Sequence, residues 1–323
     1  MIQVLQPGPA AREETVPPIR LAIVGFGKIA RDQHVPAIAT TPGIALTAIA
    51  SHDGGLEGIP YFKTLDHLLS EGPQIDAVAL CTPPQVRRAQ AEVALAAGKH
   101  VLLEKPPGAT VSEIAPLVAQ AQRAGRTLFA TWHSRFAPAV EPARAFLAER
   151  TLRAVTIAWK EDVRIWHPGQ AWIWEPGGLG VFDPGINALS ILTEILPRPI
   201  FLTRAELAFP ANRAAPIAAD LDFSDTNGLA IHAEFDFRQT GPQSWDILVE
   251  TADGVLVLSK GGAELAHDGK KLVETPEAEY RGIYRRFVEL IAGGMSDVDL
   301  VPLQHVADAF MLGRRTLVEP FED

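Results

Sequence analysis

The amino-acid sequence predicts two domains: an α/β domain with a doubly wound parallel sheet, followed by an α+β domain with an antiparallel sheet. A length of 323 residues is sufficient for two domains at roughly 100 to 200 residues each. Up to about residue 133, short apolar runs alternate with helical segments, and after about residue 150 long strand-like runs follow one another with few helices. We therefore expect a first domain over residues 19–140 and a second over 141–323, with the boundary near 133–152.

The first domain repeats strand and helix in turn. Its strand-like runs, such as LAIV and DAVAL, are apolar throughout, as expected when helices cover both faces of a parallel sheet. Segments with helical periodicity lie between them. The strands are predicted at 19–27, 44–53, 76–84, 100–106 and 127–133, and the helices at 30–42, 64–73, 85–99 and 110–125.

The second domain has longer runs that are rich in β-branched and aromatic residues, with turn signals between them. Runs of strands with few intervening helices indicate an antiparallel sheet. The strands are predicted at 152–162, 201–209, 228–237 and 244–260, and the helices near 184–196, 278–293 and 302–317.

Composition limits the possible functions. The chain carries 29 Lys and Arg residues against 39 Asp and Glu residues, a net charge of −10. This argues against nucleic-acid and anionic-membrane partners, which require positive charge, and favours small molecules.

The single cysteine, Cys81, rules out a disulfide within this sequence and fits a reducing cytoplasm. Residues 1–18 lack the pattern of a signal peptide and are expected to form a mobile leader, and no apolar stretch approaches the roughly 18 residues of a membrane span.

The strongest motif is GxGxxA, formed by Gly25, Gly27 and Ala30 directly after the strand LAIV. Here glycine allows a tight turn and the close approach of a pyrophosphate to the helix N-terminus, and alanine allows the helix to pack closely on the strand. A glycine turn in another βα unit is the simpler alternative. The preceding strand, the following helix and the repeated βα pattern favour a dinucleotide site.

Ser51 and His52 end the second predicted strand, where an NAD-selective site usually presents an acidic residue to the ribose. A hydroxyl and an imidazole donate hydrogen bonds and do not repel a 2′-phosphate, so we expect NADP to be accepted and preferred. Asp53 follows directly and could still serve NAD. A polar turn without a cofactor contact is the plain alternative.

Two further strands end in residues suited to a cofactor site. Thr82 and Pro83 follow DAVAL, beside Cys81, which we expect to be a small buried residue rather than a nucleophile. The strand HVLL ends abruptly at Glu104 and Lys105. A lysine desolvated beside a nicotinamide would have a lowered pKa and could transfer protons, whereas a solvated strand end is the common alternative.

A tryptophan-rich segment begins at Trp166 and ends in a polar pair, Asp183 and Asn187. If a helix begins after Asp183, this residue lies at its N-cap or in its first turn, with Asn187 on the same face. Indole rings cover the C–H faces of sugars while amides and carboxylates bind the hydroxyls, so the composition fits a sugar site. A capped helix with surface aromatics is the alternative.

Other candidates carry weaker signals, and each taken alone is expected to be structural. No His/Asp/Glu cluster shows the spacing of zinc ligands and no GxSxG pattern is present, so we expect neither a metal site nor a nucleophilic serine. The weaker candidates are His133, Glu161, His167 and Trp245.

With GFGKIA, EKPPGAT and GGLGVFDPGINALSIL in this order, the sequence resembles the family of glucose-fructose oxidoreductases and inositol dehydrogenases, Gfo/Idh/MocA, from about Ile19 to the C-terminus. Further blocks, such as ATWHSR, WKEDVR and SDVDLVPL, resemble its bacterial branch that oxidises L-arabinose and D-galactose at C1. The resemblance implies a Rossmann domain, a large open antiparallel sheet that forms a homodimer or higher oligomer, and oxidation of an aldopyranose to a lactone by NADP or NAD.

The resemblance also implies residue roles, with Lys105, Asp183 and Asn187 as a catalytic trio. The wider family usually has histidine where Asn187 stands, and asparagine does not titrate, so proton removal falls to Lys105 or Asp183. The branch can carry arginine where His52 stands, which bears on 2′-phosphate binding. The implied cofactor contacts are Gly25, Gly27, Lys28, Ile29, Ser51, His52, Thr82, Pro83, Glu104 and Lys105, and the implied sugar contacts are His133, Glu161, Trp166, His167, Asp183, Asn187 and Trp245.

Two other functions stay open at this point. One is a dehydrogenase of another polyol, such as an inositol or a dihydrodiol, which would keep Lys105 as well. The other is a regulatory protein that binds a dinucleotide and a sugar without turnover. The intact trio counts against the regulator, and a substrate panel separates the two dehydrogenases.

Overall fold

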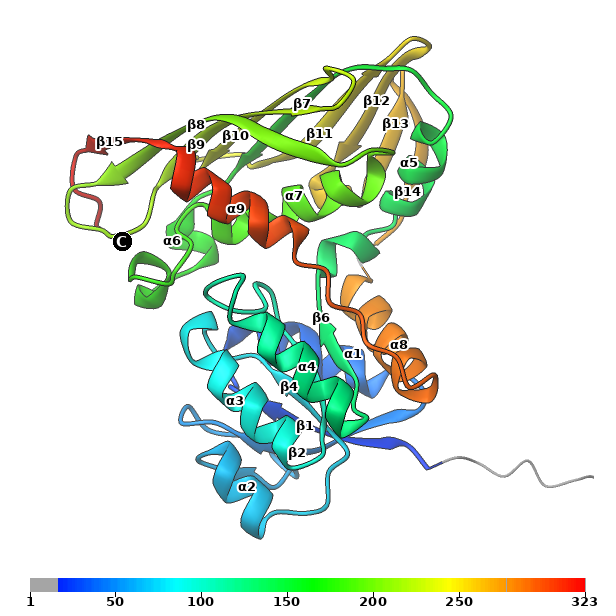
Figure 1. Cartoon of the computed structure of the whole chain (residues 1–323), viewed down its shortest axis with the longest axis vertical. Coiled ribbons are helices and arrows are strands. Elements are labelled where there is room, and N and C mark those ends of the chain that lie inside the picture. Colours follow the sequence, from blue (N-terminus) through cyan, green and yellow to red (C-terminus); the bar gives the residue numbers. More distant parts are fainter. Residues whose placement is uncertain (1–16, 277, 323) are drawn as a thin grey trace, which may run out of the picture.

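The computed structural model describes residues 17–276 and 278–322, which form two sheets (Figure 1). A six-stranded parallel sheet occupies the lower half of the figure, and a nine-stranded, mostly antiparallel sheet occupies the upper half. The predicted α/β and α+β classes are confirmed. The expected leader, residues 1–18, lies outside the described residues apart from its last two positions. None of the described helices combines the length and apolarity needed to cross a membrane.

The first sheet has the strand order β3-β2-β1-β4-β5-β6, so the chain moves outward from β1 in one direction and then returns to its other side. The strands are parallel, which brings their carboxyl ends to one edge. In such sheets ligands bind beside the strands where the order reverses, here β1 and β4. The strands are β1 (Ile19–Val24), β2 (Ile44–Ala50), β3 (Tyr61–Phe62), β4 (Ala77–Leu80), β5 (His100–Leu103) and β6 (Leu128–Ala130).

Successive residues of β1 point to opposite faces of the sheet. Ala22 and Val24 pack with residues of α2, α3 and α4, whereas Leu21 and Ile23 pack with α1 and α8. The helix α8 comes from late in the chain and covers this face beside α1 (Figure 1). The helices that flank the sheet are η1 (Ala30–His34), α1 (Val35–Ala39), α2 (Leu65–Glu71), α3 (Pro84–Ala96), α4 (Ile114–Ala124) and α8 (Glu279–Ala292).

The second sheet has the strand order β14-β13-β12-β11-β7-β10-β9-β8-β15. Its neighbours are antiparallel except β7 with β10 and β8 with β15, which run parallel. Buried and less buried residues alternate along β9 and β10, as expected when only one face packs on a core. The strands are β7 (Leu152–Lys160), β8 (Ile200–Pro210), β9 (Ala218–Asp225), β10 (Ala230–Asp236), β11 (Ser244–Thr251), β12 (Gly254–Ser259), β13 (Glu264–His267), β14 (Lys270–Glu274) and β15 (Arg314–Val318).

Helices α7, α9 and α5 cover the inner face of the second sheet, which is turned toward the first (Figure 1). The buried face of the sheet and these helices form one continuous core. No helix of the described residues covers the opposite, outer face (Figure 1). The remaining helices are η2 (His133–Phe136), α5 (Val140–Leu147), α6 (Val163–Trp166), η3 (Ala171–Trp174), α7 (Phe182–Ile195), η4 (Lys260–Gly262) and α9 (Val301–Leu312).

The structure differs from the sequence predictions in the second half. The helix predicted at 302–317 ends at Leu312, and the following residues form β15 because they pair with β8. Strands β9, β13 and β14 were not predicted, nor was helix α5. The helix predicted at 278–293 exists but packs in the core of the first sheet. A division of the chain near residue 140 therefore stays a proposal.

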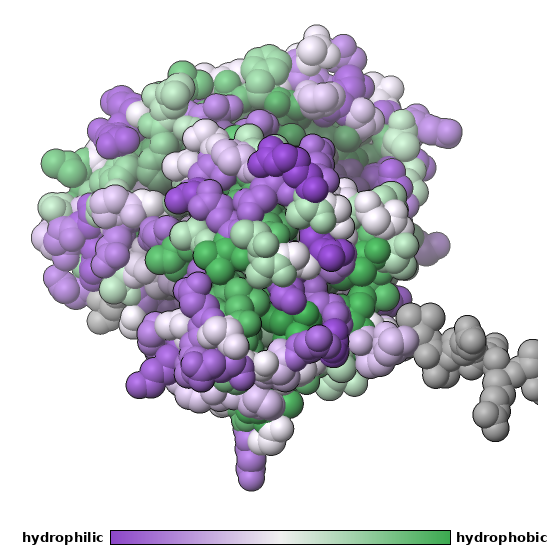
Figure 2. All heavy atoms as spheres, turned by 60° about the horizontal axis from the view of Figure 1, so that its bottom comes forward, coloured by the Kyte–Doolittle hydropathy of each residue, from purple (hydrophilic) through white to green (hydrophobic). Residues whose placement is uncertain are grey.

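The forward face in Figure 2 belongs to the lower half of Figure 1, and hydrophilic and apolar residues are interspersed on it. Exposed apolar side chains are normal on soluble folds when polar residues separate them.

Candidate active site

The GxGxxA loop closely adjoins the end of β4. Gly25 has φ +85°, and a Cβ atom there would lie 2.7 Å from Thr82 Cγ2, so only glycine fits this position. Gly27 has open space where its Cβ would be. A helix follows directly, and the first N–H groups of a helix generally have no partner within it and suit a phosphate. This cradle fits the pyrophosphate of a dinucleotide.

Ser51 connects β2 to the glycine loop. Its Oγ accepts hydrogen bonds from Phe26 N at 3.2 Å and Asp53 N at 3.1 Å, and the side chain is buried. The hydroxyl thus fixes the loop from inside, and its predicted contact with a cofactor phosphate stays a prediction. His52 and Asp53 are exposed beside it.

A residue that the sequence analysis did not select, Arg31, lies at the same strand end. Its Nη2 is 3.5 Å from the backbone oxygen of Asp53, and its guanidinium carbon is 4.1 Å from the centre of the Phe26 ring. The side chain is exposed and comes from η1, directly after the motif. Its position four residues after Gly27, one helical turn beyond the motif, was the signal that could have identified it as a cation beside the cofactor loop.

Lys28, Ile29 and Pro83 occupy the outer part of the predicted cofactor site. Lys28 is exposed and forms an ion pair with Asp32 one turn later. Ile29 is 38% exposed, which is high for an isoleucine next to a buried strand end. Pro83 is the N-cap residue of α3.

A buried arginine, Arg87, fixes the ends of β4 and β5 relative to each other. Its guanidinium donates hydrogen bonds to the backbone oxygens of Thr82, Glu104 and Pro106. Burial lowers its pKa, with the carboxylate of Glu104 as the main opposing influence. The sequence analysis did not select this residue either, since its helical position gave no indication of burial.

Lys105 and Asp183 form an ion pair between the two sheets. The Lys105 Nζ lies 3.1 Å from Asp183 Oδ2 and 3.1 Å from the Asp183 backbone oxygen. The two side chains are 13% and 3% exposed, so the pair is largely desolvated. The second carboxylate oxygen, Asp183 Oδ1, is buried and has no hydrogen-bond partner. A buried carboxylate oxygen left unpaired is costly, and such an atom marks a place where a ligand can bind.

Helix α7 carries the carboxylate to this position. It begins at Phe182, so Asp183 lies in its first turn, where the helix dipole favours a negative charge. The N-cap position belongs to Val181, which corrects the alternative that Asp183 caps the helix. Asn187 lies one turn further on and is half-buried.

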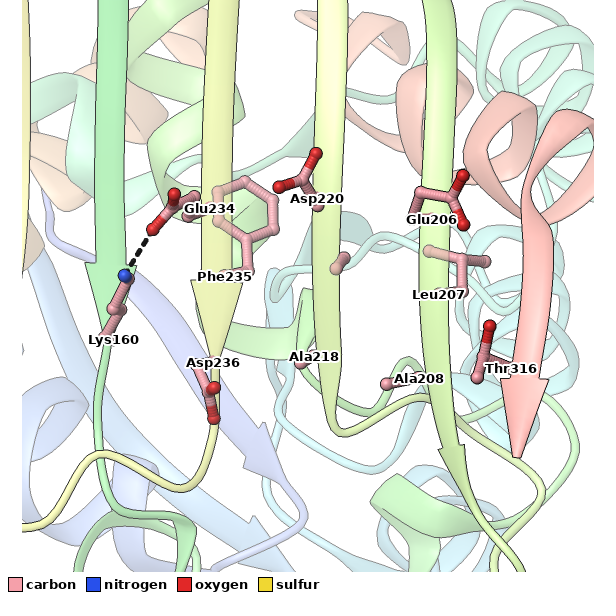
Figure 3. Close-up of a pocket in the computed structure, with 11 residues that line it drawn as sticks. Lys160, Glu206, Leu207, Ala208, Ala218, Asp220, Glu234, Phe235, Asp236 and Thr316 are labelled. Atoms are coloured by element: carbon pink, nitrogen blue, oxygen red, sulfur yellow. Dashed lines mark hydrogen bonds and ion pairs between the residues drawn. The ribbon is translucent and has the colours of Figure 1, made fainter. Parts of the chain in front are cut away.

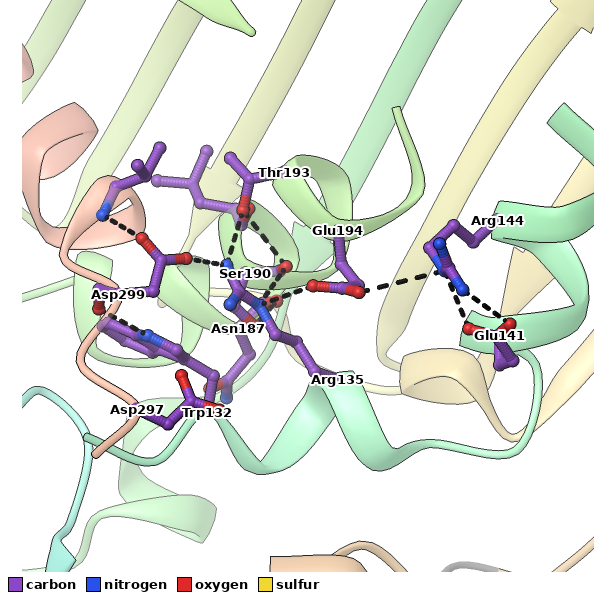
Figure 4. A network of polar contacts seen from close by, with 12 residues as sticks. Trp132, Arg135, Glu141, Arg144, Asn187, Ser190, Thr193, Glu194, Asp297 and Asp299 are labelled. Carbon is purple, nitrogen blue, oxygen red and sulfur yellow. Dashed lines mark hydrogen bonds and ion pairs between the residues drawn. The ribbon is translucent and has the colours of Figure 1, made fainter. Parts of the chain in front are cut away.

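A network of polar contacts anchors α7 further along the helix (Figure 4). Arg135 donates from Nε to the Ser190 backbone oxygen at 3.1 Å, and from Nη2 to Thr193 Oγ1 at 3.1 Å and Asp299 Oδ2 at 2.5 Å. Figure 4 shows Asn187 beside this network. The network holds the helix that carries Asp183 against η2 and the segment before α9.

Glu161, His167 and Trp245 converge on the same ion pair. The His167 Nε2 lies 3.3 Å from Glu161 Oε1 and 3.8 Å from Asp183 Oδ2. Trp245 donates from Nε1 to Glu161 Oε2 at 2.9 Å. Trp166 is 39% exposed and meets Trp245 edge to face, with ring centres 5.2 Å apart. Three of the weaker candidates, together with Trp166, therefore gather beside the Lys105–Asp183 pair.

His133 has a different environment. Its Nδ1 pairs with the Glu279 carboxylate, and its ring stacks on Tyr280 with centres 5.4 Å apart. Burial lowers its pKa but the carboxylate of Glu279 outweighs this, so the pKa is raised. The charge of Lys105 acts in the opposite direction and lowers the pKa of His133 by a smaller amount. Its predicted contact with a sugar stays a prediction.

The outer face of the second sheet carries another cluster of charged groups (Figure 3). Asp220, His232 and Glu234 bring potential ligand atoms within 4.8 Å of one another, the one such group in residues 17–276 and 278–322. Glu234 is paired with Lys160, and Asp220 with Arg204. Existing cationic partners neutralise these carboxylates, and the prediction that the protein needs no metal is unchanged.

Comparisons with known proteins bear on this arrangement. Residues 19–131 match the model of an oxidoreductase family described by its NAD-binding Rossmann fold. The chain is 50% identical to galactose 1-dehydrogenase of Pseudomonas fluorescens over 95% of this chain and 99% of that protein. It is 61% identical to a crystal structure of a D-galactose-1-dehydrogenase protein from Rhizobium etli, with a TM-score of 0.91 over 96% and 99% of the two chains.

A more distant structure shares the fold. The chain matches a 3-ketoreductase from Actinomadura kijaniata, solved with TDP-benzene and NADP, at 19% identity. The TM-score is 0.80 over 93% of this chain and 99% of that one. At this identity the likeness concerns the fold alone.

Proposed function

The chain belongs to the Gfo/Idh/MocA oxidoreductase family with its NAD-binding Rossmann fold, and on that premise we propose that it oxidises D-galactose or L-arabinose at C1 to the lactone with NADP or NAD. The observation that carries this proposal is the buried Lys105–Asp183 pair, whose carboxylate keeps one oxygen unpaired. The pair lies where the end of β5, beside the dinucleotide cradle, meets α7 of the second sheet.

Oxidation at C1 removes a hydride from the carbon and a proton from its hydroxyl. A bound nicotinamide supplies the hydride acceptor. Asp183 Oδ1 offers an acceptor for the hydroxyl proton, and the Lys105 ammonium donates a hydrogen bond that steadies the oxygen as it becomes a carbonyl. Asn187, one turn away on α7, orients the hydroxyl but cannot take its proton.

The sugar is proposed to bind against the tryptophans of the second sheet. Trp166 and Trp245 offer apolar ring surface, and Glu161 and His167 offer hydrogen-bonding groups within reach of Asp183. This combination of flat apolar rings and buried polar groups is what a pyranose requires.

NADP is the proposed preferred cofactor. Arg31 and His52 lie together at the end of β2, and an arginine at this position accommodates a 2′-phosphate. Asp53 is next to them and leaves room for NAD as well. Association of two or more copies through the outer face of the second sheet is a further proposal, which light scattering tests directly.

Initial rates test the activity. We expect purified protein to form NADPH faster with D-galactose or L-arabinose than with D-glucose or myo-inositol, and NMR to identify the product as the lactone. Faster turnover of myo-inositol would instead assign a polyol dehydrogenase. Measurable NADP binding without turnover of any aldose would favour the non-catalytic regulator.

A further inference from the structure

The side chain of Glu104, directly before Lys105, points into the protein interior. It is 3% exposed, and its carboxylate accepts hydrogen bonds from the backbone N–H of Lys105 at 2.6 Å and from the Tyr280 hydroxyl at 2.8 Å. The Nε2 of His34 lies 3.2 Å from the same carboxylate. Three separated parts of the chain, η1, β5 and α8, therefore meet at one carboxylate.

The ring of His34 is fixed at both nitrogens. Its Nδ1 lies 2.6 Å from the Tyr284 hydroxyl, and its Nε2 lies 3.5 Å from Cys81 Sγ in addition to Glu104. The predicted burial of Cys81 is only partial, and its nearest basic group is this histidine. A group held at both ends in a desolvated site has little freedom, so His34 can hold Glu104 in one orientation.

The charges around Glu104 favour its ionised form. Burial alone would raise the pKa of this carboxyl, but the hydrogen bond and charge of His34, with the charges of His133 and Lys105, lower it to about 2. Glu279 pairs with His133 on the far side of Tyr280, and Arg87 binds the Glu104 backbone oxygen. These neighbours therefore favour the ionised carboxylate of Glu104, in the residue directly before Lys105.

The proposed chemistry makes no use of these groups, yet they are connected to Lys105 through the peptide unit that joins it to Glu104. Tyr280 and Tyr284 come from α8, which crosses back from the second half of the chain to the first sheet. Lys105 is held against Asp183 from one side by α7, and from the other side by this buried carboxylate.

We propose that Glu104, oriented by His34 and Tyr280, is a positioning residue that fixes Lys105 against Asp183. The inference rests on the proposed role of Lys105 as the hydrogen-bond donor to the C1 oxygen. The groups that face Glu104 are His34 from η1, Cys81 after β4, Arg87 from α3, Lys105 after β5, His133 from η2, and Glu279, Tyr280 and Tyr284 from α8.

Tyr280→Phe and Glu104→Gln test the proposal because each removes one feature and keeps the side-chain shape. Tyr280→Phe should lower kcat by on the order of 10- to 10²-fold, as for a small misplacement of a reacting group, while the KM for sugar and the Kd for NADPH stay within about twofold. Tyr61→Phe, the same change at an exposed position of β3, is the matched control and should keep wild-type kcat.

The split between kcat and KM is the readout that a purely structural role would not give, because a general loss of folding would weaken sugar binding as well. Glu104→Gln replaces the carboxylate that accepts hydrogen bonds from the Lys105 backbone N–H and the Tyr280 hydroxyl, so its kcat should fall at least as far as that of Tyr280→Phe, while the KM for sugar stays within about twofold. If Glu104→Gln does not fold by circular dichroism, Tyr280→Phe decides the question alone. Wild-type kcat in Tyr280→Phe, or in a folded Glu104→Gln, would overturn the proposal.

Lys105→Met separates this proposal from the one on which it rests. An inactive Lys105→Met beside fully active Tyr280→Phe and Glu104→Gln would reject the positioning role alone. An active Lys105→Met would reject the proposed chemistry itself. Fluorescence titration with NADPH, performed on all four variants, shows that each still binds the cofactor.

Discussion

Two clusters of one histidine and two carboxylates lie in very different surroundings, one on the outer face of the second sheet and one beside α7, which covers its inner face. At the inner site, the side chains of Glu161, Asp183 and His167 are 5%, 3% and 16% exposed. In the outer cluster, Asp220, His232 and Glu234 are 41%, 38% and 47% exposed and are neutralised by Lys160 and Arg204.

The comparison shows that residue types alone do not mark a functional site. Water screens the outer charges and satisfies their remaining hydrogen-bonding capacity. The charges of the inner group are buried, so water neither screens them nor completes their hydrogen bonds, and Asp183 Oδ1 is left without a partner. A protein keeps such an unsatisfied buried group when a ligand completes it, so burial and incomplete pairing distinguish the inner site.

The largest expected effect concerns the inner ion pair. Lys105→Met or Asp183→Ala should lower kcat by on the order of 10² to 10⁴, because Asp183 is the proposed acceptor of the hydroxyl proton and Lys105 the proposed donor that steadies the oxygen. Each should also shift the pKa seen in the kcat profile, whereas Asn187→Ala should lower kcat without such a shift. Stopped-flow or steady-state rates across pH measure both. Lys270→Met, an exposed lysine on β14, is the control.

If both charge-removing variants fold, bind NADP and retain most of kcat, then the Lys105–Asp183 pair does not take part in the chemistry. The base would then be sought among His133, His167 and Glu161.

A smaller effect is expected at the sugar-facing side of the inner site. Trp166→Ala and His167→Ala should raise the KM for sugar about 10-fold, the equivalent of one buried hydrogen bond or ring contact, with NADP affinity near normal. Sugar titrations at saturating NADP measure this. His67→Ala is the control, since His67 lies beside Glu71 at 3.1 Å on an exposed helix. Equal losses for sugar and cofactor would point to a folding defect instead.

Arg31 is exposed, like the outer cluster, but we expect it to bind the cofactor, so it tests whether an exposed charge can also be functional. A bound 2′-phosphate would form charge-assisted hydrogen bonds with it, which are stronger than neutral ones. Arg31→Ala should therefore reduce the ratio of kcat/KM for NADP to that for NAD about 10-fold, and His52→Asp should shift it in the same direction by repulsion. Arg123→Ala on α4 is the control. An unchanged ratio in both variants would remove this strand end from the cofactor site.

The smallest effect is expected at His232. The hydrogen bond with Asp222 raises its pKa against the effect of burial, and the charge of Asp220 adds to this. Because the folded pKa is the higher one, the stabilisation is complete below the unfolded pKa of about 6.5 and is lost as pH rises through the folded value. His232→Gln should cost less than about 1 kcal/mol of unfolding free energy at pH 6, and less still at pH 9.

Urea unfolding of dilute protein at the two pH values measures this difference, and kcat should stay within about twofold of wild type. The expected value is that of the separate chain. A loss several times larger that grows with protein concentration would mean that a second copy buries the outer cluster, as the proposed association through this face predicts. A large loss that does not depend on concentration would contradict the comparison.

Local sequence patterns were sufficient to predict much of this fold. The βα alternation predicted the parallel sheet, and the apolar runs predicted where its strands end, so Gly25, Thr82 and Lys105 were assigned to one sheet edge before any contact was known. The spacing of Asp183 and Asn187 likewise predicted a shared helix face. These predictions succeeded because each depends on neighbours within a few residues.

Only the tertiary structure decided which of these parts meet. The return of α8 to the first sheet, the pairing of β15 with β8, and the inward turn of Glu104 toward Tyr280 all join residues far apart in the chain. Periodicity indicates that a face is buried but not against what, and it does not distinguish the buried Glu161 and His167 from the exposed Glu234 and His232. That difference arises from packing between distant elements, which removes water from one cluster and leaves it around the other.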